Sequence, residues 1–280
     1  MILVTGATGN AGGALVRTLA GTGTPVRALV RRPVEHLAGQ PAGGPVEQAL
    51  GDLNDPASVA GALEGVRGVF LLAGYARMDE TLAALARAGV EHVVLLSASA
   101  AEAADVSNPV SAYHVESERL VRESGVPWTI LRPRTFMSNT LRWADQLKAG
   151  DVVRDSFPDV AVATVDPLDI AAVAAAALTE KGHDGQVYGL TGPEPLRPAD
   201  RLRVLGAALG RELRFEGLSD EEARARMVAE GMPEPYVEAF MGFFARGELD
   251  ESEVLPTVER VTGRPPRTFE QWAAANASRF

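Results

Sequence analysis

Short apolar runs alternate with amphipathic stretches along the first half of the chain. Six runs are predicted to be strands: Ile2–Val4, Pro25–Val30, Val46–Leu50, Gly68–Ala73, Glu91–Ser97 and Trp128–Leu131. Apolar spacing and end signals predict helices between them, namely one carrying Leu15, Val16 and Leu19, then Asp55–Leu63, Asp79–Ala88 and Pro109–Ser124. Strands alternating with helices of about ten residues are typical of right-handed βαβ units. We therefore predict an α/β fold with a Rossmann-like, doubly wound parallel sheet.

The regular alternation weakens after Gly150. We predict a strand over Val160–Thr164, a helix over Pro167–Thr179 and a strand over Val187–Leu190 that returns to the sheet. Further helices are predicted at Pro198–Leu209, Asp220–Glu230, Pro235–Ala245, Glu253–Thr262 and Phe269–Ala277. The expected organisation is a nucleotide-binding domain over residues 1–150, joined by the returning strand near 187–190. Residues 151–280 are expected to form a mostly helical substrate-binding subdomain over the carboxyl edge of the sheet.

A glycine-rich turn joins the first predicted strand to the first helix. Its three glycines are spaced Gly-x-x-Gly-x-x-Gly, in the strand–turn–helix context that a dinucleotide site requires. The first glycine allows a tight turn, the second a close approach to pyrophosphate, and the third tight packing of helix on strand. Free N–H groups and the positive dipole end at the helix start then attract phosphates. The cofactor residues predicted here are Gly6, Thr8, Gly9, Asn10, Ala11 and Gly12.

The residues that end the second and third strands predict which nucleotide binds. Arg31 and Arg32 follow the second strand, where an acidic residue would select NAD and an arginine accommodates the 2′-phosphate of NADP. A guanidinium can pair bidentately with that phosphate. NADP(H) is therefore preferred over NAD(H), although solvated surface arginines would look the same. Asp52, followed by Leu53, is a candidate to accept a hydrogen bond from adenine or simply a turn residue.

Composition excludes several other classes of function. The chain has 280 residues, 46% of them hydrophobic, and a net charge of −10 with no basic cluster, which argues against a nucleic-acid partner. The absence of cysteine excludes disulfides and thiolate chemistry. No metal is predicted, because the histidines (His36, His92, His114 and His183) lack ligand spacing. We expect no signal peptide, no membrane partner and a cytoplasmic location, since the chain starts with a predicted strand and no apolar run approaches roughly 18 residues.

Together these motifs resemble a known family. TGATGNAGG at the N-terminus, LVRRP after the second strand and GDLND after the third resemble the atypical short-chain dehydrogenases. HVESERLVRESGVPWTILRPRTFMSN is similar to their NmrA-like branch, which includes NADP(H)-dependent type-2 quinone and azo-dye reductases. The segment TGRPPRTFEQW resembles that branch's C-terminal part. The resemblance is weakest from about residue 195 to 255.

The resemblance implies an active site around one helix, from which the superfamily's Tyr-x-x-x-Lys pair is missing. In one alignment Tyr113 is the tyrosine and Ser117 replaces the lysine; in the other, which we prefer, His114 replaces the lysine and Val110 the tyrosine. His114 and Glu118 lie four residues apart on one helix face, and an ordinary imidazole pKa suits proton transfer near neutrality. The candidate catalytic residues are His114, Tyr113 and Ser97, while a paired surface histidine is the alternative for His114.

Strand ends complete the expected crevice, because ligands of open α/β sheets bind beyond the carboxyl ends of the strands. Beyond the glycine turn and the residues of the second and third strand ends, the expected cofactor contacts are Ala73, Gly74, Ser97, His114, Pro133, Thr135 and Phe136. The expected substrate contacts are Tyr75, Ser99, Phe136, Asn139 and Trp143. The aromatics among them are equally consistent with core packing. The cluster of Phe240, Met241, Phe243 and Phe244 is expected to be core or lid packing.

Three functions remain open from the sequence. The first is an NADPH-dependent reductase that acts by hydride transfer on a quinone or similar planar carbonyl electrophile, for which positioning matters more than acid–base groups. The second is a biosynthetic tailoring enzyme, a ketoreductase, epimerase or dehydratase of a polyketide-like substrate. The third is a regulatory protein that senses NAD(P) without turnover, which the missing Tyr/Lys pair favours. The expected partner is a small aromatic or quinone-like molecule, and a homodimer is compatible with the sequence.

Overall fold

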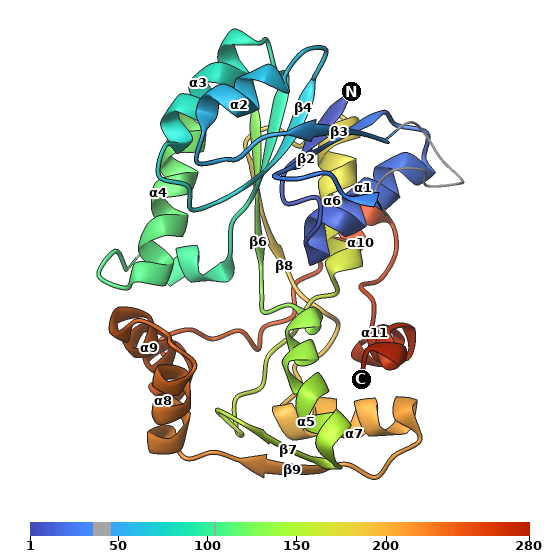
Figure 1. Ribbon diagram of the computed structural model, residues 1–280, viewed down its shortest axis with the longest axis vertical. Helices are drawn as coiled ribbons and strands as arrows, with labels where there is room; N and C mark the ends of the chain where they lie inside the picture. The colour runs from blue at the N-terminus through green and yellow to red at the C-terminus, as the bar shows by residue number, and fades with distance from the viewer. Residues whose placement is uncertain (36–45, 104) are drawn as a thin grey trace.

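The computed structural model describes residues 1–35, 46–103 and 105–280, and a seven-stranded parallel sheet dominates it (Figure 1). The strands lie in the order β3-β2-β1-β4-β5-β6-β8. Their bounds are β1 (Ile2–Val4), β2 (Val26–Val30), β3 (Val46–Leu50), β4 (Gly68–Leu72), β5 (His92–Leu96), β6 (Trp128–Pro133) and β8 (Gln186–Leu190). The strand order reverses between β1 and β4, the position at which open α/β sheets bind ligands. The predicted Rossmann-like fold class is confirmed.

Helices cover both faces of this sheet (Figure 1). One face carries α1 (Asn10–Gly21), α6 (Pro167–Thr179) and α10 (Thr257–Thr262). The other carries α2 (Pro56–Gly61), α3 (Met78–Arg87) and α4 (Pro109–Glu123). Within β5, Val94 faces the first core while Val93 and Leu95 face the second. Burial on both faces explains why the central strands are nearly continuous apolar runs.

Local capping signals explain where the helices start. The Asn108 side chain accepts hydrogen bonds from the backbone N–H groups of Val110 and Ser111 at 2.9 and 3.3 Å, and Pro109 is the first residue of α4. Asp166 caps α6 in the same way through a 2.9 Å bond. An acceptor side chain followed by proline satisfies the free donors of the first turn. Both helices begin at the predicted prolines, Pro109 and Pro167.

The chain beyond residue 150 contributes to both parts of the molecule. Helix α6 packs beside α1 with Ile170 and Val173 in the core of the sheet. Strand β8 pairs in parallel with β6, with Val187 opposite Ile130. The returning strand is therefore confirmed, while the division of the chain at residue 150 stays a prediction.

A smaller part of the molecule lies beyond the carboxyl ends of the strands (Figure 1). Its helices are α5 (Ala144–Ala149), α7 (Pro198–Leu209), α8 (Asp220–Ala229), α9 (Glu234–Phe240) and α11 (Phe269–Asn276). Trp143, Leu205 and Phe269 belong to its core. Two strands that the sequence did not predict, β7 (Val152–Asp155) and β9 (Arg214–Gly217), pair in parallel there.

Three predictions for the second half of the chain are wrong in detail. Residues 160–164 form no regular strand, because Val162 pairs with Leu196 only through an isolated bridge. The helix expected from Glu253 starts at Thr257, because proline precedes it and the upstream Glu251 is tied to Ser99 by a hydrogen bond. The helix expected over 235–245 ends at Phe240 and widens into a π turn over Met241–Ala245.

Candidate active site

In the glycine-rich turn, the backbone at the start of α1 packs directly against the backbone that follows β1. Gly6 has a φ of +60°, which side chains rarely adopt, and a Cβ there would lie 2.6 Å from Leu72 Cδ1. A Cβ on Gly12 would lie 2.3 Å from the carbonyl oxygen of Gly6. Both values are far below van der Waals contact. The first turn of α1 can therefore press against the end of β1 only because residue 12 is glycine.

The amino end of α1 is open to an anion. Its N-cap is Gly9, no side chain caps the helix, and no acidic residue lies in its first turn. The positive end of the helix dipole and its free N–H groups therefore face the adjoining cleft without a protein counter-charge from that turn. This donor set, with the cradle that a Cβ on Gly12 would fill, fits the pyrophosphate of a dinucleotide.

The cleft beside this turn has a volume of about 450 Å³. Ten of the predicted cofactor residues line it: Gly6, Thr8, Gly9, Asn10, Ala11, Gly12, Arg31, Asp52, Leu53 and Phe136. The others do not, namely Arg32, Ala73, Gly74, Ser97, His114, Pro133 and Thr135. The structure thus gathers the residues assigned to the phosphates and adenosine, and it separates Arg31 from Arg32.

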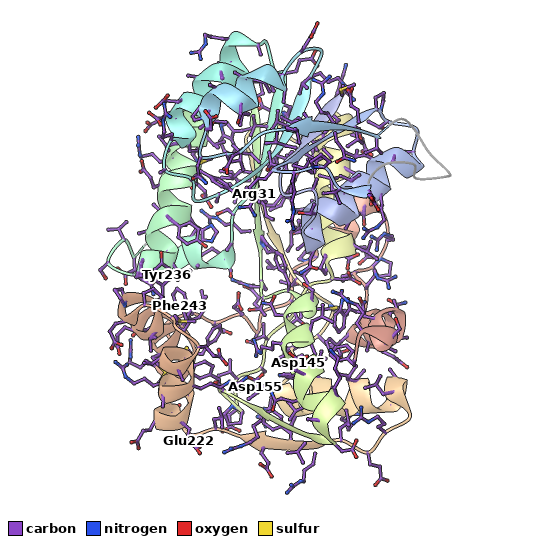
Figure 2. The ribbon with its side chains drawn as sticks, in the orientation of Figure 1. Arg31, Asp145, Asp155, Glu222, Tyr236 and Phe243 are labelled. Atoms are coloured by element: carbon purple, nitrogen blue, oxygen red, sulfur yellow. The ribbon has the colours of Figure 1, made fainter. Side chains whose placement is uncertain are left out.

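The adenosine end of the cleft contains an acid, a cation and a phenol. Asp52 Oδ1 accepts hydrogen bonds from the backbone and side-chain nitrogens of Asn54 at 2.9 and 3.1 Å. Burial raises the pKa of Tyr75, the charge of Asp52 adds to the rise, and Arg31 opposes it, so all three side chains share one electrostatic environment. Tyr75, predicted to contact substrate, therefore lies with the nucleotide cleft. Figure 2 labels Arg31 in the sheet-bearing half of the molecule.

Ser97, His114 and Glu118 form one buried cluster. Ser97 Oγ donates a hydrogen bond of 2.7 Å to Glu118 Oε1 and lies 3.5 Å from Nδ1 of His114. Glu118 also accepts two bonds from Arg132, at 2.8 and 2.7 Å, and one from Arg122 at 2.9 Å. His114 and Glu118 expose 7% and 1% of their surfaces. The predicted neighbourhood of His114 and Glu118 is present, with Ser97 between them.

Burial makes the His114 imidazole neutral. Desolvation lowers its pKa to about 4, against the smaller opposing effect of Glu118. For Glu118, burial alone raises the pKa, but the hydrogen bonds from Arg132, Ser97 and Arg122 outweigh it and the net shift is downward. The ordinary imidazole pKa on which the predicted proton transfer depends is thus lowered here, because an apolar environment disfavours the charged form of His114.

The cluster also assigns the imidazole tautomer. An ionised Glu118 only accepts, so the single hydroxyl proton of Ser97 points to it. Nδ1 of His114 must then carry a proton to bond the Ser97 oxygen, which leaves Nε2 as an acceptor. This proton placement follows from the hydrogen-bond network and not from observed hydrogens.

Tyr113 lies apart from this cluster's polar atoms. Its ring is 4.1 Å from that of His114 and packs over Gly74, where a Cβ would be 3.1 Å from Tyr113 Cδ2. It lines a separate groove with Gly74 and Ser117, and the Ser117 hydroxyl donates to the Tyr113 carbonyl oxygen at 2.7 Å. Burial, followed by the charge of Tyr236, raises the Tyr113 pKa. Nothing at Ser117 substitutes for the missing lysine.

A second cavity of about 310 Å³ adjoins the end of β6. Thr135 and Asn139 from the predicted set line it. Its other lining residues are Arg142, Asp155, Ser156, Phe157, Val160, Val162, Pro198, Arg201, Arg226, Met227, Glu230, Met232, Phe240 and Phe244. Figure 2 labels Asp155 in the smaller half of the molecule, between α5 and α8. Thr135 lines this cavity and the following residue, Phe136, lines the cleft beside the glycine-rich turn, so the segment after β6 forms part of the wall of both spaces.

Two residues predicted to contact substrate are buried and do not line either cavity. Trp143 exposes none of its surface, and its Nε1 donates a 2.6 Å bond to Asp155. Ser99, also buried, donates to Glu251, which accepts a second bond of 2.6 Å from the Thr135 hydroxyl. The structure therefore does not bring Trp143 or Ser99 into either cavity.

The sequence missed the cationic part of the second cavity. Arg142 and Arg201 lie in helical segments, and Asp155 ends a strand that was not predicted. Phe240 and Phe244, expected to be packing residues, line the cavity, while Phe243 is buried. The sequence did not distinguish Arg201 from a surface arginine, because Asp200 and Arg203 lie beside it in the same helix.

Over 1–35, 46–103 and 105–280 no helix is long and apolar enough to cross a membrane. In the same ranges, no three or more His, Cys, Asp or Glu side chains are grouped to hold a metal. His36 lies outside them.

Comparisons with known proteins agree with this geometry. A sequence profile described as NAD(P)H-binding matches residues 6–181. The chain is 45% identical to the (4-alkanoyl-5-oxo-2,5-dihydrofuran-3-yl)methyl phosphate reductase of Streptomyces griseus and 37% identical to the NAD(P)H azoreductase of Xenophilus azovorans. Each alignment covers 100% of this chain and 99% of the relative. The structure of an NADPH-dependent quinone oxidoreductase from Escherichia coli matches with a TM-score of 0.79 at 25% identity, covering 98% of this chain and 99% of that one.

Proposed function

This chain belongs to the NAD(P)H-binding family and is an NAD(P)H-dependent oxidoreductase, and from that premise we propose that it prefers NADPH and reduces a quinone or similar planar carbonyl electrophile. The resemblance to NmrA-like atypical short-chain dehydrogenases is confirmed by the same comparisons. The observation that carries the proposal is that consecutive residues, Thr135 and Phe136, line a largely apolar cavity and the nucleotide cleft respectively. A flat acceptor in that cavity would lie against the end of the cofactor cleft.

The chain's own residues provide binding and orientation. Gly9, Asn10 and Gly12 would hold the pyrophosphate, and Arg31 would pair with the 2′-phosphate. The nicotinamide supplies hydride-transfer chemistry when it is bound. Phe136, on the cleft side of the wall, would exclude water from the nicotinamide face.

The missing Tyr-x-x-x-Lys pair is compatible with this reaction class. In a conjugated acceptor the charge that develops on oxygen is delocalised, so positioning contributes more than a strong general acid. His114 and Ser97 line neither the cleft nor the second cavity. We therefore propose them as positioning residues, which act through Glu118 on Arg132 near the end of β6. Tyr113 lines a separate groove and is given no part in the reaction.

The names of the relatives support the substrate class. An azo compound, a quinone and a 5-oxo-2,5-dihydrofuran are all conjugated, electron-poor acceptors. The 45% identical relative favours a second candidate function within the same class, the reduction of a conjugated lactone in a biosynthetic sequence. A purely regulatory role loses support, since these relatives are reductases.

NADPH oxidation with a matched panel tests the proposal. The panel contains a naphthoquinone, an azo dye, an acyl-butenolide and a saturated ketone of similar size. We expect at least one conjugated member to turn over at about one per second or faster, and the saturated ketone to be inert. The Gly12→Val variant, whose side chain fills the cradle, controls for nonspecific reduction. Tight NADPH binding without oxidation by any conjugated member would contradict the proposed activity.

A further inference from the structure

Arg201 is a buried cation without a hydrogen-bonding partner. It lies on α7, exposes 4% of its surface and lines the second cavity. Its enclosed Nε donates to nothing, and no side-chain hydrogen bond or ion pair of its guanidinium occurs within the described residues. Its guanidinium carbon lies 5.5 Å from the centre of the Trp143 ring. A cation–π contact offsets only part of the cost of burying an unpaired charge.

The nearest acid is already neutralised. Asp155 Oδ2 accepts bonds of 2.6 and 3.1 Å from Arg142 and one of 2.6 Å from Trp143, while Oδ1 accepts from the Ser156 N–H at 2.9 Å. Burial, and then the charge of Arg142, lower the pKa of Arg201 to about 10, with Asp155 opposing them. Arg201 therefore stays charged at neutral pH, in a position that disfavours a second cation.

The rest of the cavity adds no unpaired acid. Glu230 pairs with Arg226 at 2.8 Å, and both line the cavity. Counting Arg142, Arg201 and Arg226 against Asp155 and Glu230 leaves one net positive charge among the lining residues. The cavity thus combines a cationic end with an extensive apolar wall.

The apolar wall is held in a specific shape. Phe157 has a φ of +56°, the one positive φ of a non-glycine residue in the described chain, and its ring lies 5.3 Å from that of Phe244. A left-handed backbone at a bulky residue is costly and persists only when the surroundings impose it. Here the strained residue lines the cavity.

We propose that Arg201 binds a compact oxyanion of the substrate, such as a phosphomonoester, while the wall of Phe157, Phe240 and Phe244 holds an alkyl or aryl portion. The inference rests on the proposed function, because it assigns the second cavity to the substrate. It adds that the substrate is an amphiphilic anion. The anionic end lies on α7, and the reducible part then extends toward Thr135 and the wall shared with the cofactor cleft.

Binding without turnover tests this assignment. Calorimetry on NADP⁺-saturated protein compares n-hexyl phosphate with n-hexanol, which lacks only the anion. We expect the phosphate to bind the wild type at least about tenfold more tightly than the alcohol, and Arg201→Gln to remove that difference. Arg203→Gln, the same charge change at an exposed site on α7, is the matched control and should keep it. Equal affinities of the two ligands for the wild type, or an unchanged preference in Arg201→Gln, would overturn the proposal.

Thermal unfolding separates ligand binding from a structural role. If Arg201 serves the substrate, Arg201→Met should unfold at the same or a higher temperature than the wild type, because it removes an unpaired buried charge. If Arg201 serves the fold, that variant should unfold at a clearly lower temperature, which would contradict the proposal. The binding result is also independent of the reductase assay. Inert electrophiles with intact hexyl phosphate binding would reject only the proposed reaction, and active reduction without anion binding would reject only the anion site.

Discussion

Thr135 and Phe136 are consecutive residues that line different cavities. Phe136 faces the nucleotide cleft, and Thr135 faces the cavity that also contains Arg201 and Asn139. They follow Arg134, the first residue after β6, at the carboxyl edge of the sheet, where ligands of this fold bind. A cofactor and a substrate bound in these two spaces would therefore contact adjacent residues of one segment.

The cradle under α1 should tolerate no side chain. Gly12→Ala places a Cβ 2.3 Å from the Gly6 carbonyl oxygen, so we expect loss of NADPH binding by at least about tenfold and a lower unfolding temperature. Gly21→Ala in the same helix is the control, because nothing lies within 4 Å of its Cβ. Gly21→Ala should raise the free energy of unfolding by up to about 1 kcal/mol. Fluorescence titration and thermal melts measure both, and unchanged nucleotide affinity in Gly12→Ala would refute the assigned contact.

Only one of the two consecutive arginines should select the nucleotide. Arg31→Gln should weaken NADPH binding by about tenfold or more and leave NADH nearly unchanged, because it removes the bidentate partner of the 2′-phosphate. Arg32→Gln should change the affinity for neither NADPH nor NADH, since Arg32 does not line the cleft. Dissociation constants of both nucleotides for both variants provide the check. Equal losses for NADPH and NADH in Arg31→Gln would remove the assigned role.

Acid should destabilise the fold through His114. Its pKa is lowered from 6.5 to about 4 in the folded state, so the unfolded chain binds the proton more readily between these values. Stability contributed by this group is complete above pH 6.5 and falls as the pH drops toward 4, by on the order of 3 kcal/mol. His114→Gln should lose less stability than the wild type between pH 7 and pH 4.5, measured by urea unfolding. Parallel losses in the two proteins would show that His114 does not carry this effect.

Glu118 should matter much more than Glu123, its neighbour on the same helix. Glu118→Gln leaves Arg132 and Arg122 without their buried carboxylate and should cost about 3 kcal/mol of unfolding free energy. Glu123→Gln removes an exposed partner of Arg119 and should cost less than about 0.5 kcal/mol. Denaturant titration compares the two. Similar losses would mean that the buried pairing contributes no more than a surface one.

The central fold could be predicted because its signals are local. The turn over Gly6–Gly12, the cap at Asn108 and the apolar run of β5 each contain within a few residues what determines their conformation. Six of the ten predicted cofactor residues that line the cleft belong to this turn, so the motif itself carries their geometry; the other four follow the ends of β2, β3 and β6, where the sheet topology places them.

The second cavity could not be predicted, because its lining residues come from distant segments. Strand β7 pairs with β9, about sixty residues further along, and neither has a strong apolar pattern. Asp155 comes close enough to influence the pKa of Arg201 only when these distant segments fold together. The neutral state of His114 depends on burial, which no sequence pattern shows. Trp143 was assigned to a ligand from its type, whereas its indole N–H supports Asp155 from behind.

The hydrogen bonds of Glu251 couple the two halves of the site. This residue follows the helices α8 and α9 beside the second cavity, and its carboxylate accepts hydrogen bonds from Ser99 beyond β5 and from Thr135 beyond β6. One carboxylate therefore ties the segment after α9 to the ends of two neighbouring strands. Replacing it by an amide or an alanine would release both strand ends together, although Glu251 itself is far from either of them in the sequence.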